Sequence, residues 1–239
     1  RNQLVLHYQP KYEAPAGPII GAEALLRWNH PTRGLVGPDQ FIPTAEKTGL
    51  ILSIGEWVIN EACRQMREWI NAGQGHWTIA VNISALQFAH ASLVETVRSA
   101  LERHGVPPAC LTLEVTESTA MRDAEASLAV LKRLSNLGVT ISIDDFGTGY
   151  SSLLYLKRLP ATELKIDRGF VNQLENDNED AAIVSAIVAL AQQLNLRIVA
   201  EGVETPAQQK FLTGLGCDSL QGFLLGKPMP ATEFLEHAV

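Results

Sequence analysis

The sequence predicts an α/β fold, a TIM-like (β/α)8 barrel in which one strand runs antiparallel to its neighbours. Short apolar runs alternate with segments of helical apolar spacing, which is typical of β/α units around a parallel sheet. The length of 239 residues suits one such barrel, which needs roughly 250 residues. Many of the apolar runs also finish in a carboxylate or an amide. Because barrel strands converge at their C-terminal ends, these polar residues predict an active site at that mouth.

Eight strands are expected, each a short run rich in apolar or β-branched residues. They cover residues 4–10, 19–28, 78–84, 111–117, 140–146, 161–167, 197–203 and 217–223. Only the segment from Lys11 to Pro18 separates the first two strands. That connection is too short for a helical crossover, so this pair is expected to run antiparallel.

Helix signals fill the gaps between these strands. Pro38 opens a short helix that Gly49 ends, and Thr205-Pro206 is a threonine cap followed by Pro in the first helical position. Longer stretches of helical apolar spacing cover residues 53–72, 123–137 and 181–196. The first two of these end at glycines, which favour helix C-termini.

Composition excludes several classes of protein. The formal charge of −7 and the pI of about 5.4 argue against a DNA or RNA surface, which is normally basic. The three cysteines, Cys63, Cys110 and Cys217, form no CxxC pair, so neither a disulfide framework nor a thiolate zinc site is indicated. A reducing compartment is therefore expected, and we interpret the chain as a cytoplasmic domain.

We expect residues 1–239 to form one domain excised from a longer protein. No linker or low-complexity tract divides the sequence, and no apolar run reaches the ~18 residues of a membrane helix. The chain starts at Arg1 without an initiator Met and enters a strand almost at once. Sensory or regulatory segments are expected outside it, and anchoring of the full-length protein in the inner membrane is one such arrangement.

The adjacent carboxylates of Asp144 and Asp145 give the sharpest chemical signal. They close the strand over residues 140–146, where two buried negative charges are costly unless a cation compensates them. Glu23, Asn82 and Glu114 end other strands. This set of hard oxygen ligands, without His or Cys, favours Mg²⁺ or Mn²⁺ over zinc, and the adjacent aspartates suit two bridged ions.

Other strand-end residues leave alternatives open. Glu201 and Glu204 could be further site residues or caps of the following helix. Lys165, inside an apolar strand, could orient an anionic nucleophile at the mouth or extend to the surface like an ordinary lysine. Arg27 could clamp a phosphate or form a surface ion pair.

Together, these residues resemble a known family. Glu23-Ala24-Leu25, within residues 21–28, is similar to the signature of EAL domains, bacterial phosphodiesterases of cyclic di-GMP. Further matches to the family pattern follow in order along the chain, at residues 8–10, 41–43, 81–84, 113–117, 144–149, 164–167, 200–204 and 221–223. Gly169 stands where the family often has Ser, and Phe223 where it often has Tyr.

The resemblance implies roles for individual residues. Two Mg²⁺ or Mn²⁺ ions would be bound by Glu23, Asn82, Glu114, Asp144 and Asp145. Glu23, Lys165 and Glu201 would be catalytic, with Lys165 contacting the nucleophilic water. The substrate would be held by Gln9, Leu26, Arg27, Asp145, Glu204 and Gln221. Glu117 would anchor the loop 146–152, which often meets a second subunit.

The resemblance also implies a reaction and partners. Cyclic di-GMP would be hydrolysed to linear 5′-pGpG, which lowers the level of this second messenger, and Ca²⁺ would inhibit. A homodimer and covalently attached sensory or GGDEF-type domains are expected. Two other hypotheses remain at this point: a catalytically silent module that binds cyclic di-GMP and signals to a protein partner, and a metal-dependent barrel lyase of the enolase sort, which also uses strand-end carboxylates and a lysine.

Overall fold

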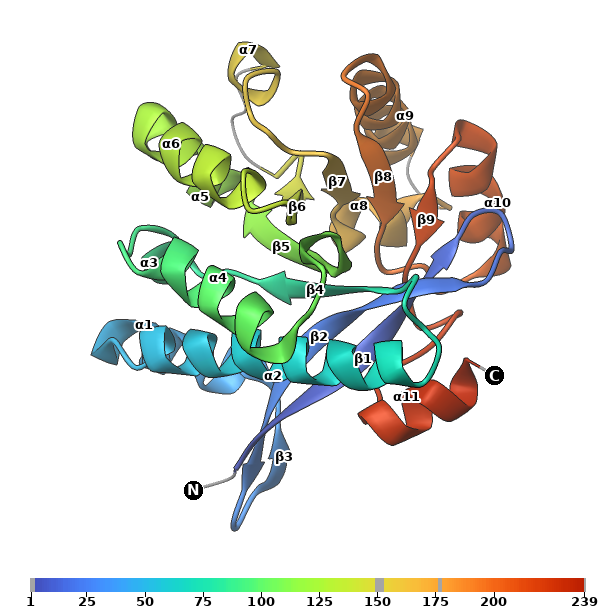
Figure 1. Ribbon diagram of the computed structural model, residues 1–239. Coiled ribbons are helices and arrows are strands. Elements are labelled where there is room, and N and C mark those ends of the chain that lie inside the picture. Colours follow the sequence, from blue (N-terminus) through green and yellow to red (C-terminus); the bar gives the residue numbers. More distant parts are fainter. Residues whose placement is uncertain (1–2, 149–152, 176–177, 239) are drawn as a thin grey trace.

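The strands form one sheet that closes on itself, with helices around the outside (Figure 1). The computed structural model describes residues 3–148, 153–175 and 178–238. In this part of the chain the strand order is β1-β9-β8-β7-β6-β5-β4-β2-β3, and pairing of β1 with β2 completes the barrel. The strands are β1 (Leu4–Glu13), β2 (Ile19–His30), β3 (Gly34–Val36), β4 (Thr78–Asn82), β5 (Leu111–Thr116), β6 (Thr140–Phe146), β7 (Glu163–Ile166), β8 (Arg197–Ala200) and β9 (Ser219–Leu220).

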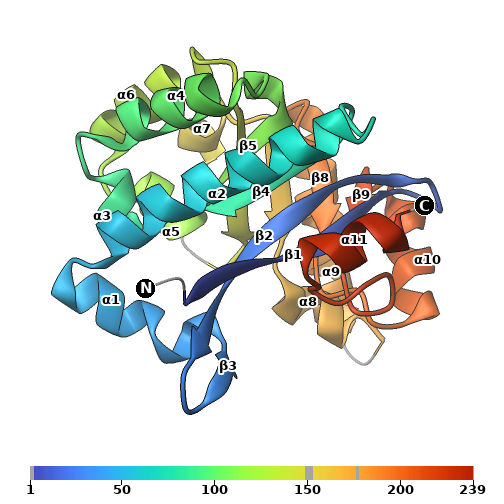
Figure 2. The same cartoon turned by 60° about the horizontal axis from the view of Figure 1, so that its bottom comes forward.

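The reversed strand is β1, as the short first connection predicts. β1 pairs antiparallel with both β2 and β9, while β2 and β4 to β9 follow one another in parallel. Figure 2 shows the long β1–β2 ribbon crossing the front of the barrel, with α11 (Ala231–His237) beside it. The barrel with one antiparallel strand is therefore confirmed.

Helices cover the outside of the barrel. They are η1 (Pro38–Gln40), α1 (Ile42–Thr48), α2 (Ile51–Asn71), α3 (Ala85–Phe88), α4 (Leu93–His104), η2 (Pro108–Cys110), α5 (Glu117–Met121), α6 (Ala124–Ser135), α7 (Leu153–Leu156), α8 (Arg168–Gln173), α9 (Asn178–Gln193) and α10 (Pro206–Leu215), in addition to α11. The threonine start of α10 is a full capping box, because Thr205 and Gln208 bond each other's backbone N–H groups.

One local expectation was wrong, and one short strand was missed. The helix expected from Pro38 is broken at Phe41, whose backbone (φ −129°, ψ −25°) separates η1 from α1. The short strand β3 was not expected, because three residues are too few to show a period of two. β3 folds back on β2, pairing Val36 with Trp28.

Burial alternates along the strands between two environments. Apolar residues such as Ile79, Leu113 and Leu164 belong to the hydrophobic core that packs against the helices. The alternating positions fill the inside of the barrel and are largely polar yet buried: Lys11, Thr112, Glu114, Ser142, Glu163, Lys165, Ser219 and Gln221. The polar residues at the C-terminal ends of the strands therefore lie directly above a barrel interior that is itself polar.

Candidate active site

A hollow of about 610 Å³ lies at the C-terminal mouth of the barrel. Most of the sequence-predicted residues line it. These are Gln9, Glu23, Arg27, Asp144, Asp145, Lys165, Glu201, Glu204 and Gln221. Because the lining comes from β1 near the start of the chain and from Gln221 near its end, closure of the barrel assembles the site.

Lys165 is the centre of the charge network. Its Nζ lies 2.6 Å from Glu201 Oε1, 2.7 Å from Glu114 Oε2, 3.4 Å from Asp144 Oδ1 and 3.7 Å from Glu23 Oε2, and the side chain is 1% exposed. Burial alone would lower the pKa of the Lys165 ammonium, but the carboxylates of Asp144, Glu114, Glu201 and Glu23 outweigh burial and hold that pKa well above its usual value. These carboxylates therefore favour the charged form of Lys165.

Glu23 is fixed by hydrogen bonds at both carboxylate oxygens. Asn82 Nδ2 donates to Oε1 at 2.6 Å, and Gln221 Nε2 donates to Oε2 at 2.7 Å. Gln221 Nε2 also donates to Gln9 Oε1 at 3.2 Å. Burial opposes ionisation of Glu23, but Lys165 and these amide donors lower its pKa below the usual value. Glu23 is thus held as an oriented carboxylate.

Asp144 and Asp145 both reach the mouth because the backbone turns between them. Side chains that follow each other in a strand normally point to opposite faces. Asp145 instead has a left-handed backbone (φ 53°), and the pairing of β6 with β7 shifts register between Ile143 and Phe146. Burial, together with the charges of Asp144 and Asp167, raises the pKa of Asp145 to about 6.

The carboxylates at the mouth carry more negative charge than the single ammonium of Lys165 can neutralise. Burial raises the pKa of Glu201 to about 8 despite Lys165, and Asp144 and Glu23 add to the rise. Burial likewise raises the pKa of Glu114 well above its usual value. Although Glu114 Oε2 lies close to Lys165 Nζ, neither oxygen of this buried carboxylate accepts a hydrogen bond of good geometry from a described residue. The site therefore has capacity for additional positive charge.

The residues present fit divalent cations chemically. The carboxylates of Glu23, Glu114, Asp144 and Asp145 and the amide of Asn82 are hard oxygen ligands, and the oxygens of Glu114, which accept no hydrogen bond of good geometry, are suited to an ion. Within residues 3–148, 153–175 and 178–238, however, no three His, Cys, Asp or Glu side chains form a ready-made metal cage. The position closest to four of these carboxylates is occupied by Lys165 Nζ.

Glu117 lies at the start of α5, where it is buried. Its Oε2 accepts a hydrogen bond of 2.8 Å from the backbone N–H of Gly147, directly after β6. Gly147 has a left-handed backbone (φ 96°), which favours glycine at this turn. Glu117 is therefore tied to the first part of the loop 146–152, of which residues 149–152 lie outside the described part of the chain.

Leu26 does not line the hollow at the mouth. Glu23, Leu25 and Arg27 line the mouth, so Leu26 falls on the other face of β2 and packs against the hydrophobic core. Its carbonyl accepts a hydrogen bond of 2.9 Å from Arg27 Nη1. The Leu26 side chain therefore does not line the hollow, whereas that of Leu25 does; the substrate contact expected of Leu26 stays a prediction.

Several mouth residues were missed by the sequence reasoning. Asp167, Arg168 and Asn172 come from the segment after β7, and Asp39 comes from η1. Asp167 follows the apolar residue Ile166 at a strand end, the same signal that marked the other carboxylates. Asp39 carries no such signal, because the extra strand β3 brings η1 to the mouth.

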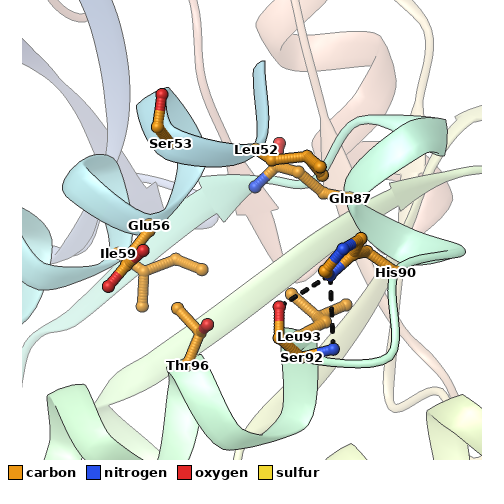
Figure 3. Close-up of a pocket in the computed structure, with 9 residues that line it drawn as sticks. All are labelled: Leu52, Ser53, Glu56, Ile59, Gln87, His90, Ser92, Leu93 and Thr96. Carbon is orange, nitrogen blue, oxygen red and sulfur yellow. Dashed lines mark hydrogen bonds between the residues drawn. The ribbon is translucent and has the colours of Figure 1, made fainter. Parts of the chain in front are cut away.

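A second hollow of about 280 Å³ lies outside the barrel between α2, α3 and α4 (Figure 3). Its polar groups are engaged locally. His90 Nδ1 bonds Ser92 Oγ at 2.7 Å, and Gln87 Oε1 accepts from Ser84 Oγ at 2.9 Å in the capping box of α3. These contacts fix the helix connections, and the chemistry is concentrated at the barrel mouth.

Comparison with known proteins places this geometry in a family. The model of the EAL domain matches residues 1–228. The chain belongs to the EAL domain family. The bifunctional diguanylate cyclase/cyclic di-GMP phosphodiesterase MucR of Pseudomonas aeruginosa is 72% identical over 98% of this chain, and the cyclic di-GMP phosphodiesterase NbdA of the same organism is 48% identical over 96%. The chain spans only 34% and 29% of these two relatives.

Solved EAL structures share the fold. One is described as the PaMucR phosphodiesterase in complex with c-di-GMP; its TM-score is 0.96 at 72% identity, covering 98% of this chain and 95% of that one. The EAL enzyme Bd1971, with cAMP and cyclic di-GMP bound, has a TM-score of 0.94 at 36% identity, covering 100% of this chain and 65% of that one. Within the described residues of this EAL domain, no helix combines the length and apolar character needed to cross a membrane.

Proposed function

We propose that this EAL domain hydrolyses cyclic di-GMP to linear 5′-pGpG with the help of two divalent cations, Mg²⁺ or Mn²⁺. The observation that carries the proposal is the convergence of Glu23, Glu114, Asp144 and Glu201 on one buried ammonium at the barrel mouth. Family membership and the names of the close relatives support the choice of substrate. The presence of every expected ligand residue favours an enzyme over a silent receptor.

The mouth suits a dinucleotide with two phosphates. Its volume of about 610 Å³ lies within the range of small-molecule sites. Arg27 of β2 and Arg168 of α8 both line the hollow and are available for phosphate oxygens. Gln9, Glu204 and Gln221 supply amide and carboxylate groups for the guanine and ribose edges. A net acidic protein can thus hold an anionic ligand through a local site.

When bound, two divalent cations supply a nucleophilic water of lowered pKa and charge stabilisation for an in-line displacement at phosphorus. The carboxylates of Glu23, Glu114, Asp144 and Asp145 and the amide of Asn82 would hold them. Lys165 would orient the attacking water and stabilise its negative charge, since its pKa is held above the usual value. Glu201, whose pKa is raised to about 8, is suited to accept and return a proton at that water near neutral pH.

The wider assembly is also part of the proposal. A homodimer is supported by Leu153 and Leu154 of α7, which follow the loop tied to Glu117 and are 57% and 76% exposed. Because the curated relatives are about three times as long, we expect this domain to be covalently attached to sensory or GGDEF-type domains. The domain itself would work in the cytoplasm, with any inner-membrane anchor supplied by another part of the full-length protein.

Product analysis tests the reaction directly. The purified domain is incubated with cyclic di-GMP and Mg²⁺, and the products are separated by chromatography. Linear pGpG that appears with Mg²⁺ and not in EDTA supports the proposal. Binding of cyclic di-GMP without any product would instead identify a receptor, and turnover of a carboxylic acid by removal of the proton next to its carboxylate would identify the lyase.

A further inference from the structure

A buried ion pair that the proposed chemistry does not use lies inside the barrel. Lys11 Nζ of β1 donates a hydrogen bond to Glu163 Oε1 of β7 at 3.1 Å. The two side chains are 2% and 6% exposed. Since β9 and β8 lie between β1 and β7 in the sheet, the pair reaches across the barrel interior instead of along a neighbouring strand.

Each partner lies one layer below a residue of the mouth. Glu163 precedes Lys165 by two residues in β7, and Lys11 follows Gln9 by two residues in β1, which runs in the opposite direction. Side chains two residues apart in a strand share a face. The Lys11–Glu163 pair therefore forms the floor beneath Lys165 and its carboxylates.

The presence of a buried ion pair is not explained by a contribution to the stability of the fold. Replacing such a pair with apolar residues is often neutral or stabilising, because desolvation offsets the attraction. The two layers also act on each other. Burial opposes ionisation of Glu163, but Lys11, with a further contribution from Lys165, keeps its pKa below the usual value.

Either partner alone would disturb the mouth. An unpaired Glu163 would be a further buried anion beneath Lys165, competing with Glu114, Asp144 and Glu201 for its ammonium. An unpaired Lys11 would be a second buried ammonium beneath the carboxylates, competing with divalent cations for Glu23 and Glu114. Mutual neutralisation prevents both outcomes.

We propose that Lys11 and Glu163 are positioning residues. Because they pair with each other, Lys165 stays free to interact with the carboxylates at the mouth, and those carboxylates stay free to bind divalent cations. This inference rests on the proposed function, because it assigns the carboxylates to metal binding. It predicts opposite defects for the two partners. Loss of Glu163 should weaken metal binding, and loss of Lys11 should lower turnover without weakening metal binding.

The test compares four variants of the purified domain: Glu163→Gln, Lys11→Met, the double variant, and Ser219→Ala. The control Ser219 is a buried side chain of the same interior layer whose loss changes no charge. Mn²⁺ binding is measured by electron paramagnetic resonance, the unfolding temperature by calorimetry in EDTA, and kcat with cyclic di-GMP. Glu163→Gln should weaken Mn²⁺ binding roughly 10- to 100-fold, as loss of residues around metal ligands typically does.

The other outcomes are equally specific. Lys11→Met should bind Mn²⁺ at least as tightly as the unmodified domain but with lower kcat, the double variant should recover both properties, and Ser219→Ala should retain Mn²⁺ affinity. Equal losses of Mn²⁺ affinity in both single variants, or losses that simply follow the unfolding temperature, would overturn the inference. If Glu163→Gln does not fold, Glu163→Asp is measured instead. Its Mn²⁺ affinity should fall by a smaller factor, and an unchanged Mn²⁺ affinity would contradict the inference.

Because Mn²⁺ binding is measured without substrate, a domain that binds Mn²⁺ but makes no pGpG would overturn the proposed function alone.

Discussion

At the scale of single residues, variants of Glu23 and Arg27 should separate metal binding from substrate binding. Both lie on the mouth face of β2, but Glu23 is buried in the Asn82 and Gln221 network, whereas Arg27 lines the outer hollow. Glu23→Ala should abolish most turnover and weaken Mn²⁺ binding. Arg27→Ala should mainly raise KM. Steady-state kinetics at several Mg²⁺ concentrations distinguish them, and an Arg27→Ala enzyme with unchanged KM and a greater metal requirement would contradict the assignment.

Glu117 and Glu114 allow a second comparison at the same scale. Glu117 accepts a hydrogen bond from the Gly147 N–H, whereas Glu114 directly contacts Lys165 among the carboxylates. Glu117→Ala should keep the fold and weaken metal binding indirectly, so high Mg²⁺ should restore part of its turnover. Glu114→Ala should not be rescued. Titrations of turnover with Mg²⁺ in the two variants check this. If high Mg²⁺ restores turnover in neither variant, Glu117 is a direct metal ligand. If Glu117→Ala has the turnover and metal requirement of the unmodified domain, Glu117 plays no part in the site.

At the scale of elements, the close approach of β9 and the segment after β8 can be tested at Gly222. A Cβ at this position would lie 2.1 Å from the carbonyl oxygen of Val203 and 2.2 Å from its nitrogen, so the backbone itself must shift. Gly222→Ala should therefore lower the unfolding temperature markedly and displace Gln221. Gly214→Ala in α10 is the control, because nothing lies within 4 Å of its Cβ; it should stabilise by about 0.5–1 kcal/mol through helix propensity. Equal unfolding temperatures would disprove the clash.

The elements also show how far sequence reasoning extends. Alternating strands and helices, the short first connection and the capped start of α10 were predictable, because each depends on local periodicity or turn chemistry. β3 was not, since it depends on pairing with β2 across a turn, and the break at Phe41 was not predicted either. Among site residues, the strand-end rule located Glu23 and Asp144. It gave no means to foresee the backbone turn at Asp145 or the arrival of Asp39 from η1.

At the scale of the whole molecule, divalent cations should stabilise the fold. A ligand at 100 times its Kd adds about 2.7 kcal/mol to the free energy of unfolding. For a domain of this size that corresponds to a rise of roughly 5–10 °C in unfolding temperature. Mn²⁺ and Mg²⁺ should give this rise together with activity, whereas Ca²⁺, larger and less strict in geometry, should stabilise without supporting turnover. Calorimetry and product assays in each ion check it; full activity in EDTA would refute the two-ion mechanism.

The metal-free domain should lose stability as pH rises from 6 to 8.5. Glu201, with a pKa of about 8 in the folded state, keeps its proton until the pH approaches 8, whereas the unfolded chain releases it near pH 4.5. The folded state thus binds more protons, and the free energy of unfolding falls with rising pH. Calorimetry in EDTA should show this slope, and Glu201→Gln should flatten it. An unfolding temperature independent of pH in the unmodified domain would contradict the raised pKa.

The hydrogen bond between Gln221 and Gln9 joins residues 212 positions apart. Contacts of such sequence separation form slowly, because the entropy of closing the loop is lost before the contact stabilises anything. During synthesis, β1 and β2 emerge first but remain without β9 until nearly the entire domain has left the ribosome. Glu23 is then without its hydrogen-bond partner Gln221, so the candidate active site is incomplete in every partly synthesised chain that lacks residue 221. Enzymatic competence should arise as an all-or-none event at barrel closure, and chains released before residue 221 should be inert towards the second messenger.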